Sequence, residues 1–218
     1  MRVTRDQAAE AASSLPPDAF RRMDESADDL FYVPTRLVTH IDDGAIAAVT
    51  DLYRNLLPAG GAVLDLMGSW VSHLPPEVAY ARVAGHGMNA AELAANPRLD
   101  ERVVQNLNLD PVLPFADHSF DGAGCCVSVQ YLTRPFEVFA EVARVLKPGA
   151  PFVVTFSNRC FPTKAVFIWQ SVDGSRQSQL VGHYMDRAGF VDVSLQTPVP
   201  EGGPGDPLRA VIGRAPAA

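Results

Sequence analysis

The sequence predicts an α/β fold in which a mostly parallel sheet is covered by helices on both faces. Seven short apolar runs of strand length lie between residues 62 and 213. Helical patterns separate most of these runs, and helix-stop signals such as Lys147-Pro148-Gly149 come directly before the next run. Strands that alternate with helices in this way are typical of a parallel sheet buried on both sides.

The predicted elements follow one another in a regular order. We expect strands over residues 62–66, 80–85, 102–107, 120–127, 151–156, 191–196 and 208–213, the last returning as a hairpin. Asp42 or Asp43 offers an N-cap for a helix that Pro58 closes, and further helices are expected over 90–96, 135–146 and 175–188. Residues 1–40 are predicted to form a helical N-terminal cap, with helical stretches over 5–14 and within 18–30. The main domain then spans 41–214 and a short tail 215–218.

Composition excludes several classes of function. A chain of 218 residues with 47% hydrophobic residues can bury one sizeable core. Its net charge of -7 argues against a nucleic-acid or anionic-membrane partner, because both favour a basic surface. No apolar run is long enough to span a bilayer and the first residues do not resemble a signal peptide, so we expect a cytoplasmic protein. The three cysteines form neither a disulfide framework nor the paired spacing of a zinc site, and no metal site is predicted.

Three segments carry a resemblance to a known family. Residues 61–70, GAVLDLMGSW, form an apolar strand that ends in an acid and a turn; residues 113–121 read LPFADHSFD, and residues 141–149 read EVARVLKPG. Together these resemble class I S-adenosylmethionine-dependent methyltransferases of the small-molecule, type-11-like kind, over about residues 40–213. The resemblance implies a Rossmann-like seven-stranded sheet that ends with an antiparallel strand, S-adenosyl-L-methionine as cofactor and a small-molecule acceptor.

The resemblance also implies a cofactor site beyond the carboxyl ends of the first four strands. Three positions that usually hold glycine in the first turn are Met67, Ser69 and Val71, and the usual ribose-binding acid after the second strand is Gly87. Asn89 is our first choice to replace that acid, with Glu92 as an alternative, although Asn89 also suits a helix N-cap. The full set of expected cofactor-binding residues is Tyr32, Arg36, Asp65, Met67, Gly68, Ser69, Met88, Asn89, Asn106, Leu107, Asn108 and Ser128.

Most of these residues are expected to contact a particular part of the cofactor. Asp65 and the turn would face the methionine end, Tyr32 and Arg36 its carboxylate, Met88 and Asn106 the adenine. Asn108 is a second candidate for the adenine.

Candidate catalytic residues come from the cap and from the segments after the fourth and fifth strands. His40 is the best general-base candidate, since the nearby Asp42 could orient its imidazole. Tyr131 and Arg159 are expected to contact the acceptor; Arg159 lies in a polar run, residues 157–164. His73 and His86 are weaker candidates near the same site.

Two other functions remain to be weighed. The altered first turn and Gly87 leave open a degenerate relative that binds the cofactor or regulates without methyl transfer. A dinucleotide-dependent oxidoreductase is disfavoured, because no Gly-x-Gly-x-x-Gly follows the first strand. The sequence also leaves a homodimer open.

Overall fold

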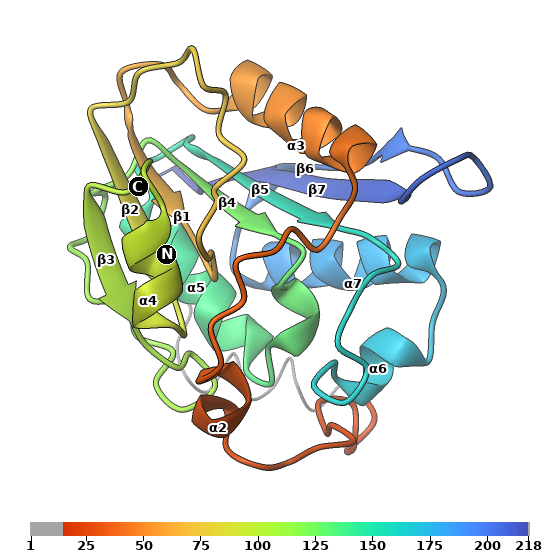
Figure 1. Ribbon diagram of the computed structural model, residues 1–218. Helices are drawn as coiled ribbons and strands as arrows, with labels where there is room; N and C mark the ends of the chain where they lie inside the picture. The colour runs from red at the N-terminus through yellow and green to blue at the C-terminus, as the bar shows by residue number, and fades with distance from the viewer. Residues whose placement is uncertain (1–14, 218) are drawn as a thin grey trace.

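The computed structural model describes residues 15–217 and contains a seven-stranded sheet in the order β3-β2-β1-β4-β5-β7-β6 (Figure 1). The strands are β1 (Ala62–Asp65), β2 (Arg82–Gly87), β3 (Glu101–Val104), β4 (Gly122–Cys126), β5 (Pro151–Phe156), β6 (Val191–Val199) and β7 (Leu208–Arg214). Strands β1 to β5 pair in parallel, whereas β7 is antiparallel to both β5 and β6. The prediction of a mostly parallel sheet that ends with an antiparallel strand is confirmed.

Helices cover both faces of the sheet, and alternate residues of the central strands point to opposite layers. Val63 and Val153 belong to the core formed with α3 (Asp43–Leu56) and α4 (Ala90–Ala95). Leu64 and Val154 belong to the other core, with α5 (Pro135–Val145), α6 (Phe167–Gln170) and α7 (Gly174–Arg187). Figure 1 shows α3 on one side of the sheet and α5 and α7 on the other. The two-sided cover agrees with central strands such as β1 and β5, in which residues on both faces are buried.

The helix ends follow the expected local chemistry. Asp42 is the N-cap of α3 and its Oδ1 accepts the Ala45 N–H at 2.9 Å, while Pro135 occupies the first turn of α5. Two short elements were not expected from the sequence: α6 and a 3₁₀ turn, η1 (Val129–Tyr131). None of the helices within 15–217 is long and apolar enough to cross a bilayer.

The N-terminal segment is less helical than predicted. Between residues 15 and 40 the only helix is α2 (Asp28–Tyr32), so the helix expected within 18–30 is confined to its end. The segment is instead fixed by side chains, because Asp28 pairs with Arg22 and Lys164 pairs with Asp24. The helix expected over 5–14 lies outside the described residues. Residues 33–41, which we call the strap, connect α2 to α3.

The strap crosses the point at which the sheet changes direction. Strands β2 and β3 lie on one side of β1, and β4 lies on the other. The Trp70 indole, after β1, donates to the strap carbonyl of Val38 at 3.0 Å, and Asn89, after β2, donates to the carbonyl of Tyr32 at 2.9 Å. In open α/β sheets ligands bind beyond the carboxyl ends of the strands at this switch point.

Candidate active site

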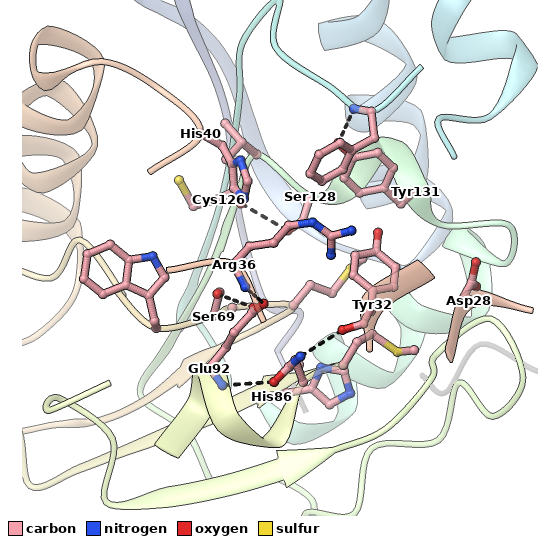
Figure 2. A pocket seen from close by; sticks show the side chains of 18 of the residues that line it. Asp28, Tyr32, Arg36, His40, Ser69, His86, Glu92, Cys126, Ser128 and Tyr131 are labelled. Atoms are coloured by element: carbon pink, nitrogen blue, oxygen red, sulfur yellow. Dashed lines mark hydrogen bonds between the residues drawn. The ribbon is translucent and has the colours of Figure 1, made fainter. Parts of the chain in front are cut away.

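A cavity of about 330 Å³ lies between the strap and the carboxyl ends of the strands (Figure 2). This volume is at the lower end of the range for small-molecule sites. The cavity wall includes every site residue that the sequence analysis nominated, namely Tyr32, Arg36, His40, Asp65, Met67, Gly68, Ser69, Met88, Asn89, Asn106, Leu107, Asn108, Ser128, Tyr131 and Arg159. The fold therefore gathers segments that are more than 100 residues apart into one site.

Backbone strain is concentrated around this cavity. Met67, His73 and Val127 line the wall, and each has a positive φ, of 54°, 53° and 44°. Such angles are unusual for residues with a side chain, and for β-branched Val127 they are a clear outlier. Met67 occupies a position where the methyltransferases that the sequence resembles usually have glycine, so the turn keeps a glycine-like backbone without the glycine. Strained backbone of this kind is enriched at functional sites.

Asp65 ends β1 beneath this turn. Its side chain is buried, and its Oδ2 has no hydrogen-bond partner within residues 15–217. A Cβ atom on Gly68 would come within 2.6 Å of that oxygen, which explains why this position of the turn is glycine. Burial raises the pKa of Asp65 to about 7, and a hydrogen bond with Ser72 opposes the shift. A cationic ligand group would therefore be stabilised here.

The end of β2 has no room for the acid that the resemblance led us to expect there. A Cβ atom on Gly87 would lie 2.5 Å from the carbonyl oxygen of Gly68, because the turn after β1 crosses directly over β2. The neighbouring Gly68 N–H donates to the carbonyl of His86 at 2.7 Å and holds the turn there. His86 is 1% exposed, and neither ring nitrogen has a partner among the described residues.

Glu92 joins three segments around the cavity. Its Oε1 accepts the backbone N–H of Arg36 in the strap at 2.7 Å, and its Oε2 accepts the Ser69 hydroxyl at 2.6 Å. Glu92 itself lies in the first turn of α4. The carboxylate thus ties the strap to the β1 turn and to α4, and Figure 2 shows it between Ser69 and the strap.

Two of the nominated amides are already bonded to the protein. The Asn89 Oδ1 caps α4 by accepting from Ala91 and Glu92, and its Nδ2 donates to the carbonyls of Tyr32 and Val33. The Asn108 Nδ2 donates to Asp28 and Tyr131, and its Oδ1 accepts the Thr133 N–H. Both side chains position the walls of the cavity and have little capacity left for a ligand.

Arg36 places a guanidinium in the cavity between aromatic rings. Its Cζ lies 4.8 Å from the ring centroid of Phe31 and 5.6 Å from that of Phe161. Two of its N–H groups donate to the carbonyls of Phe31 and Pro34, and the guanidinium forms no ion pair with a carboxylate of residues 15–217. Figure 2 shows it directed toward Tyr32 and Tyr131. This cation is available to an anionic ligand group.

The nominated catalytic residues have different surroundings. The expected His40–Asp42 pair is not formed, because Asp42 caps α3 and accepts the Asp206 N–H, whereas the His40 ring packs edge-on against Phe161 at 5.3 Å. Burial lowers the pKa of His40, and Glu92 opposes the shift. Tyr131 Oη accepts the Phe161 N–H at 2.8 Å, and burial raises its pKa to about 12. Arg159, which is largely exposed, pairs with Asp206 at 2.7 Å.

Several functional-looking residues were missed or given too little weight. Gln105 lines the cavity with a buried and unpartnered Oε1, and Arg22 and Asp28 form a buried ion pair at the wall. The only sequence signal for Gln105 is its position next to Asn106. For Arg22 and Asp28, which lie in the N-terminal segment, the sequence gives no sign that the side chains are buried.

Parts of the sequence are similar to known methyltransferases and to a biotin-biosynthesis protein. Residues 68–154 match the family model described as "Methyltransferase domain". A stretch of 80 residues is 35% identical to the methyltransferase phqN of Penicillium fellutanum, and 43 residues are 44% identical to the biotin biosynthesis bifunctional protein BioHC of Teredinibacter turnerae. The matched stretches span 24% and 8% of those two proteins.

Solved structures share the fold at low sequence identity. The chain is similar to the [4+2]-cyclase SpnF, with a TM-score of 0.61 and 17% identity over 85% of this chain and 90% of that one. It is similar to an S-adenosylmethionine-dependent methyltransferase from Aquifex aeolicus, with a TM-score of 0.58 and 16% identity over 79% and 91%. It is also similar to phosphoethanolamine N-methyltransferase 2 of Haemonchus contortus, solved with S-adenosyl-L-methionine, with a TM-score of 0.57 and 14% identity over 78% and 52%. Residues 68–154 therefore resemble a methyltransferase domain, and the fold around them is the one seen in S-adenosylmethionine-dependent methyltransferases of known structure.

Proposed function

We propose that the protein transfers a methyl group from S-adenosyl-L-methionine to a small-molecule acceptor by in-line displacement. The observation that carries the proposal is a set of buried polar groups in the cavity wall without a hydrogen-bond partner among residues 15–217: Asp65 Oδ2, the His86 ring nitrogens and Gln105 Oε1, with Arg22 Nε in the N-terminal segment. Buried polar groups are nearly always hydrogen-bonded, so three such residues at the switch point of this fold favour a polar ligand.

The residues present suit this cofactor. The buried Asp65 carboxylate would hold the ammonium group, and the unpaired Arg36 guanidinium with Tyr32 would hold the carboxylate. Met67, Gly68 and Ser69 would line the methionine end. At the other end Met88 and Leu107 offer apolar surface for the adenine, beside Asn106; Ser128 lies at the end of β4. When bound, the cofactor supplies the methyl group on a positively charged sulfur.

The protein's own part in such a reaction is to align the acceptor and exclude water. The strap, held by Glu92 and Asn89, covers the site. Burial keeps His40 neutral near pH 7, and a neutral imidazole can accept a proton from an acceptor hydroxyl or amine. Tyr131 and Arg159 would shape the acceptor side through Phe161 and Asp206.

A second function has a specific observation in its favour. Gly87 stands where the ribose acid usually lies, and Asn89, its first predicted replacement, is already bonded to the protein. A protein that binds the cofactor without transferring its methyl group accords with this loss. Similarity to a [4+2]-cyclase also illustrates that this fold does not by itself fix the reaction.

Thermal-shift and calorimetric titrations test the proposal. S-adenosylmethionine and S-adenosylhomocysteine should raise the melting temperature in proportion to their excess over Kd, and NAD should not. No shift with either sulfur compound overturns the proposal. Binding without formation of S-adenosylhomocysteine across a panel of small acceptors would favour the second function.

A further inference from the structure

His86 is an unusual residue to find in the interior without a partner. Its side chain is 1% exposed and lines the cavity, yet neither Nδ1 nor Nε2 is hydrogen-bonded to any residue of 15–217. An apolar side chain of similar size would fill this space without leaving two polar atoms unsatisfied. Such a group in a cavity wall indicates a ligand that completes its hydrogen bonds.

The strand geometry directs His86 away from the residues around Gly87. Gly85 and Gly87 face the layer that contains α4, since a Cβ atom on Gly85 would meet Leu99, which follows that helix, and one on Gly87 would approach Leu93 within it. Side chains alternate along a strand, so His86 projects from the opposite face. Ala84, two residues earlier, packs there in the same core as Leu107.

His86 also lies in the middle of the cofactor site. Its carbonyl accepts the Gly68 N–H from the turn after β1, and the Gly87 carbonyl accepts the Gln105 N–H from the segment after β3 at 3.0 Å. In the proposed function these flanking segments hold the methionine and adenine ends. The end of β2 lies between them in the sheet and would therefore face the ribose.

The other polar groups at this position are already used. Gly87 has no space for a side chain, and the Asn89 amide is bonded at both ends. Each oxygen of Glu92 already accepts a hydrogen bond, from Arg36 and from Ser69. Among the described residues, the imidazole is therefore the side chain at the end of β2 whose polar atoms both lack a hydrogen-bond partner.

We propose that His86 hydrogen-bonds the ribose hydroxyls of the cofactor, in place of the acid that related proteins carry one residue later; this rests on the proposed function. A neutral imidazole has one donor and one acceptor, which matches a hydroxyl group that can do both. Burial lowers the pKa of His86 to about 4, against a smaller effect of its own backbone, so the ring is neutral near pH 7.

Calorimetry with S-adenosylhomocysteine and its 2′-deoxy and 3′-deoxy counterparts tests the assignment without catalysis. The wild-type protein should bind at least one deoxy compound about tenfold more weakly than the parent. His86→Leu should bind S-adenosylhomocysteine about tenfold more weakly than the wild type and should bind all three compounds with similar affinity. His86→Gln should keep part of the wild-type preference for S-adenosylhomocysteine over the deoxy compounds. His183→Gln, on α7 outside the cavity wall, is the matched control and should change nothing.

The outcomes separate the two proposals. Wild-type protein that fails to bind S-adenosylhomocysteine overturns the proposed function and this assignment with it. Wild-type binding with no discrimination against either deoxy compound, or discrimination that survives in His86→Leu, overturns the role of His86 alone. Ligand-free His86→Leu should unfold at or above the urea concentration of the wild type, which verifies that its fold is intact. If that variant does not fold, His86→Gln decides the question: a reduced preference against the deoxy compounds supports the role. Full wild-type affinity and preference in His86→Gln overturns it.

Discussion

The α-carbon of Gly87 and the carbonyl oxygen of Gly68 are so close that a Cβ atom at Gly87 would stand 2.5 Å from that oxygen. Gly87→Asp, which introduces the usual acid, should therefore destabilise the protein by roughly 2 to 4 kcal/mol, because the turn after β1 must move and it is backbone that clashes. Urea denaturation measures the change.

Gly182→Ala in α7 is the control for this substitution. A Cβ atom at Gly182 would find its nearest neighbours at 3.8 and 3.9 Å, so alanine should be neutral or stabilise by up to about 1 kcal/mol through helix propensity. A Gly87→Asp protein as stable as Gly182→Ala would contradict the close approach.

Glu92 is predicted to control the closure of the site. Glu92→Ala removes the acceptor for the Arg36 N–H and for the Ser69 hydroxyl, so the strap and the β1 turn should both loosen. We expect faster hydrogen exchange at the Arg36 amide and affinity for S-adenosylhomocysteine about ten- to hundredfold lower. Glu101→Ala breaks the partly exposed pair with Arg82 outside the cavity and should leave both quantities near wild type. Unchanged exchange at Arg36 would exclude the strap contact.

Lys164 is predicted to anchor the N-terminal segment. Its ammonium group is fully buried, donates to the Ser26 carbonyl at 2.7 Å, and lies 3.1 Å from Asp24 and 3.6 Å from Asp28. Lys164→Met removes the charged hydrogen-bond donor to Ser26 while Asp28 keeps its pair with Arg22, and it should cost about 1.5 to 3 kcal/mol in urea denaturation. Lys147→Met, which breaks an exposed pair with Asp121, should cost less than about 1 kcal/mol. Equal losses would mean that the buried cation has no special role.

Tyr131 is predicted to act on the acceptor through Phe161. Tyr131→Phe deletes the oxygen that accepts the Phe161 N–H and should free the segment after β5. Once an acceptor substrate has been identified, kcat/KM for that acceptor should fall about tenfold, while the affinity for S-adenosylhomocysteine should change less than twofold. Tyr80→Phe, whose hydroxyl has no partner within 15–217, is the control and should alter neither. Equal loss of both quantities in Tyr131→Phe would contradict an acceptor-side role.

The strands and most helices could be predicted because their signals are local. Asp42, Pro135 and Gly149 mark helix ends whatever surrounds them, and the continuous apolar run of β5 is buried on both faces. The N-terminal segment could not be predicted in the same way. Its conformation depends on Lys164, more than 130 residues later, and no local pattern records that contact.

The membership of the site was also predictable, but its hydrogen bonds were not. Sequence order along parallel strands brings Asp65, Asn89, Asn106 and Ser128 to one edge of the sheet. Whether a polar side chain is free depends on what reaches it in space: Asn89 donates to Val33 of the strap, while His86 has no hydrogen-bond partner within 15–217. Position along a strand identifies candidates, and only the packed structure separates ligand contacts from structural bonds.

The buried Asp65 predicts opposite pH trends for stability and ligand affinity. Its pKa is about 7 in the folded protein and 3.8 in an exposed reference, so the folded state binds the additional proton between these values. Stability is therefore unaffected by Asp65 below pH 3.8, falls as pH rises from there to about 7, and stays low above it. The free energy of unfolding of Asp65→Asn, relative to that of the wild type, should therefore rise across this range by up to about 1.4 kcal/mol per pH unit. Urea denaturation between pH 5 and pH 8 measures the difference between the two proteins, in which the titration of other groups cancels.

Ligand affinity should change in the other direction, because an ammonium group favours the ionised carboxylate. Calorimetry should show wild-type affinity for S-adenosylhomocysteine increasing from pH 5.5 to pH 7 and Asp65→Asn affinity remaining flat. Asp192→Asn, an exposed residue of β6 away from the cavity wall, should follow the wild type in both experiments. Parallel pH curves for wild type and Asp65→Asn would show that Asp65 is ionised throughout and does not sense the ligand's charge.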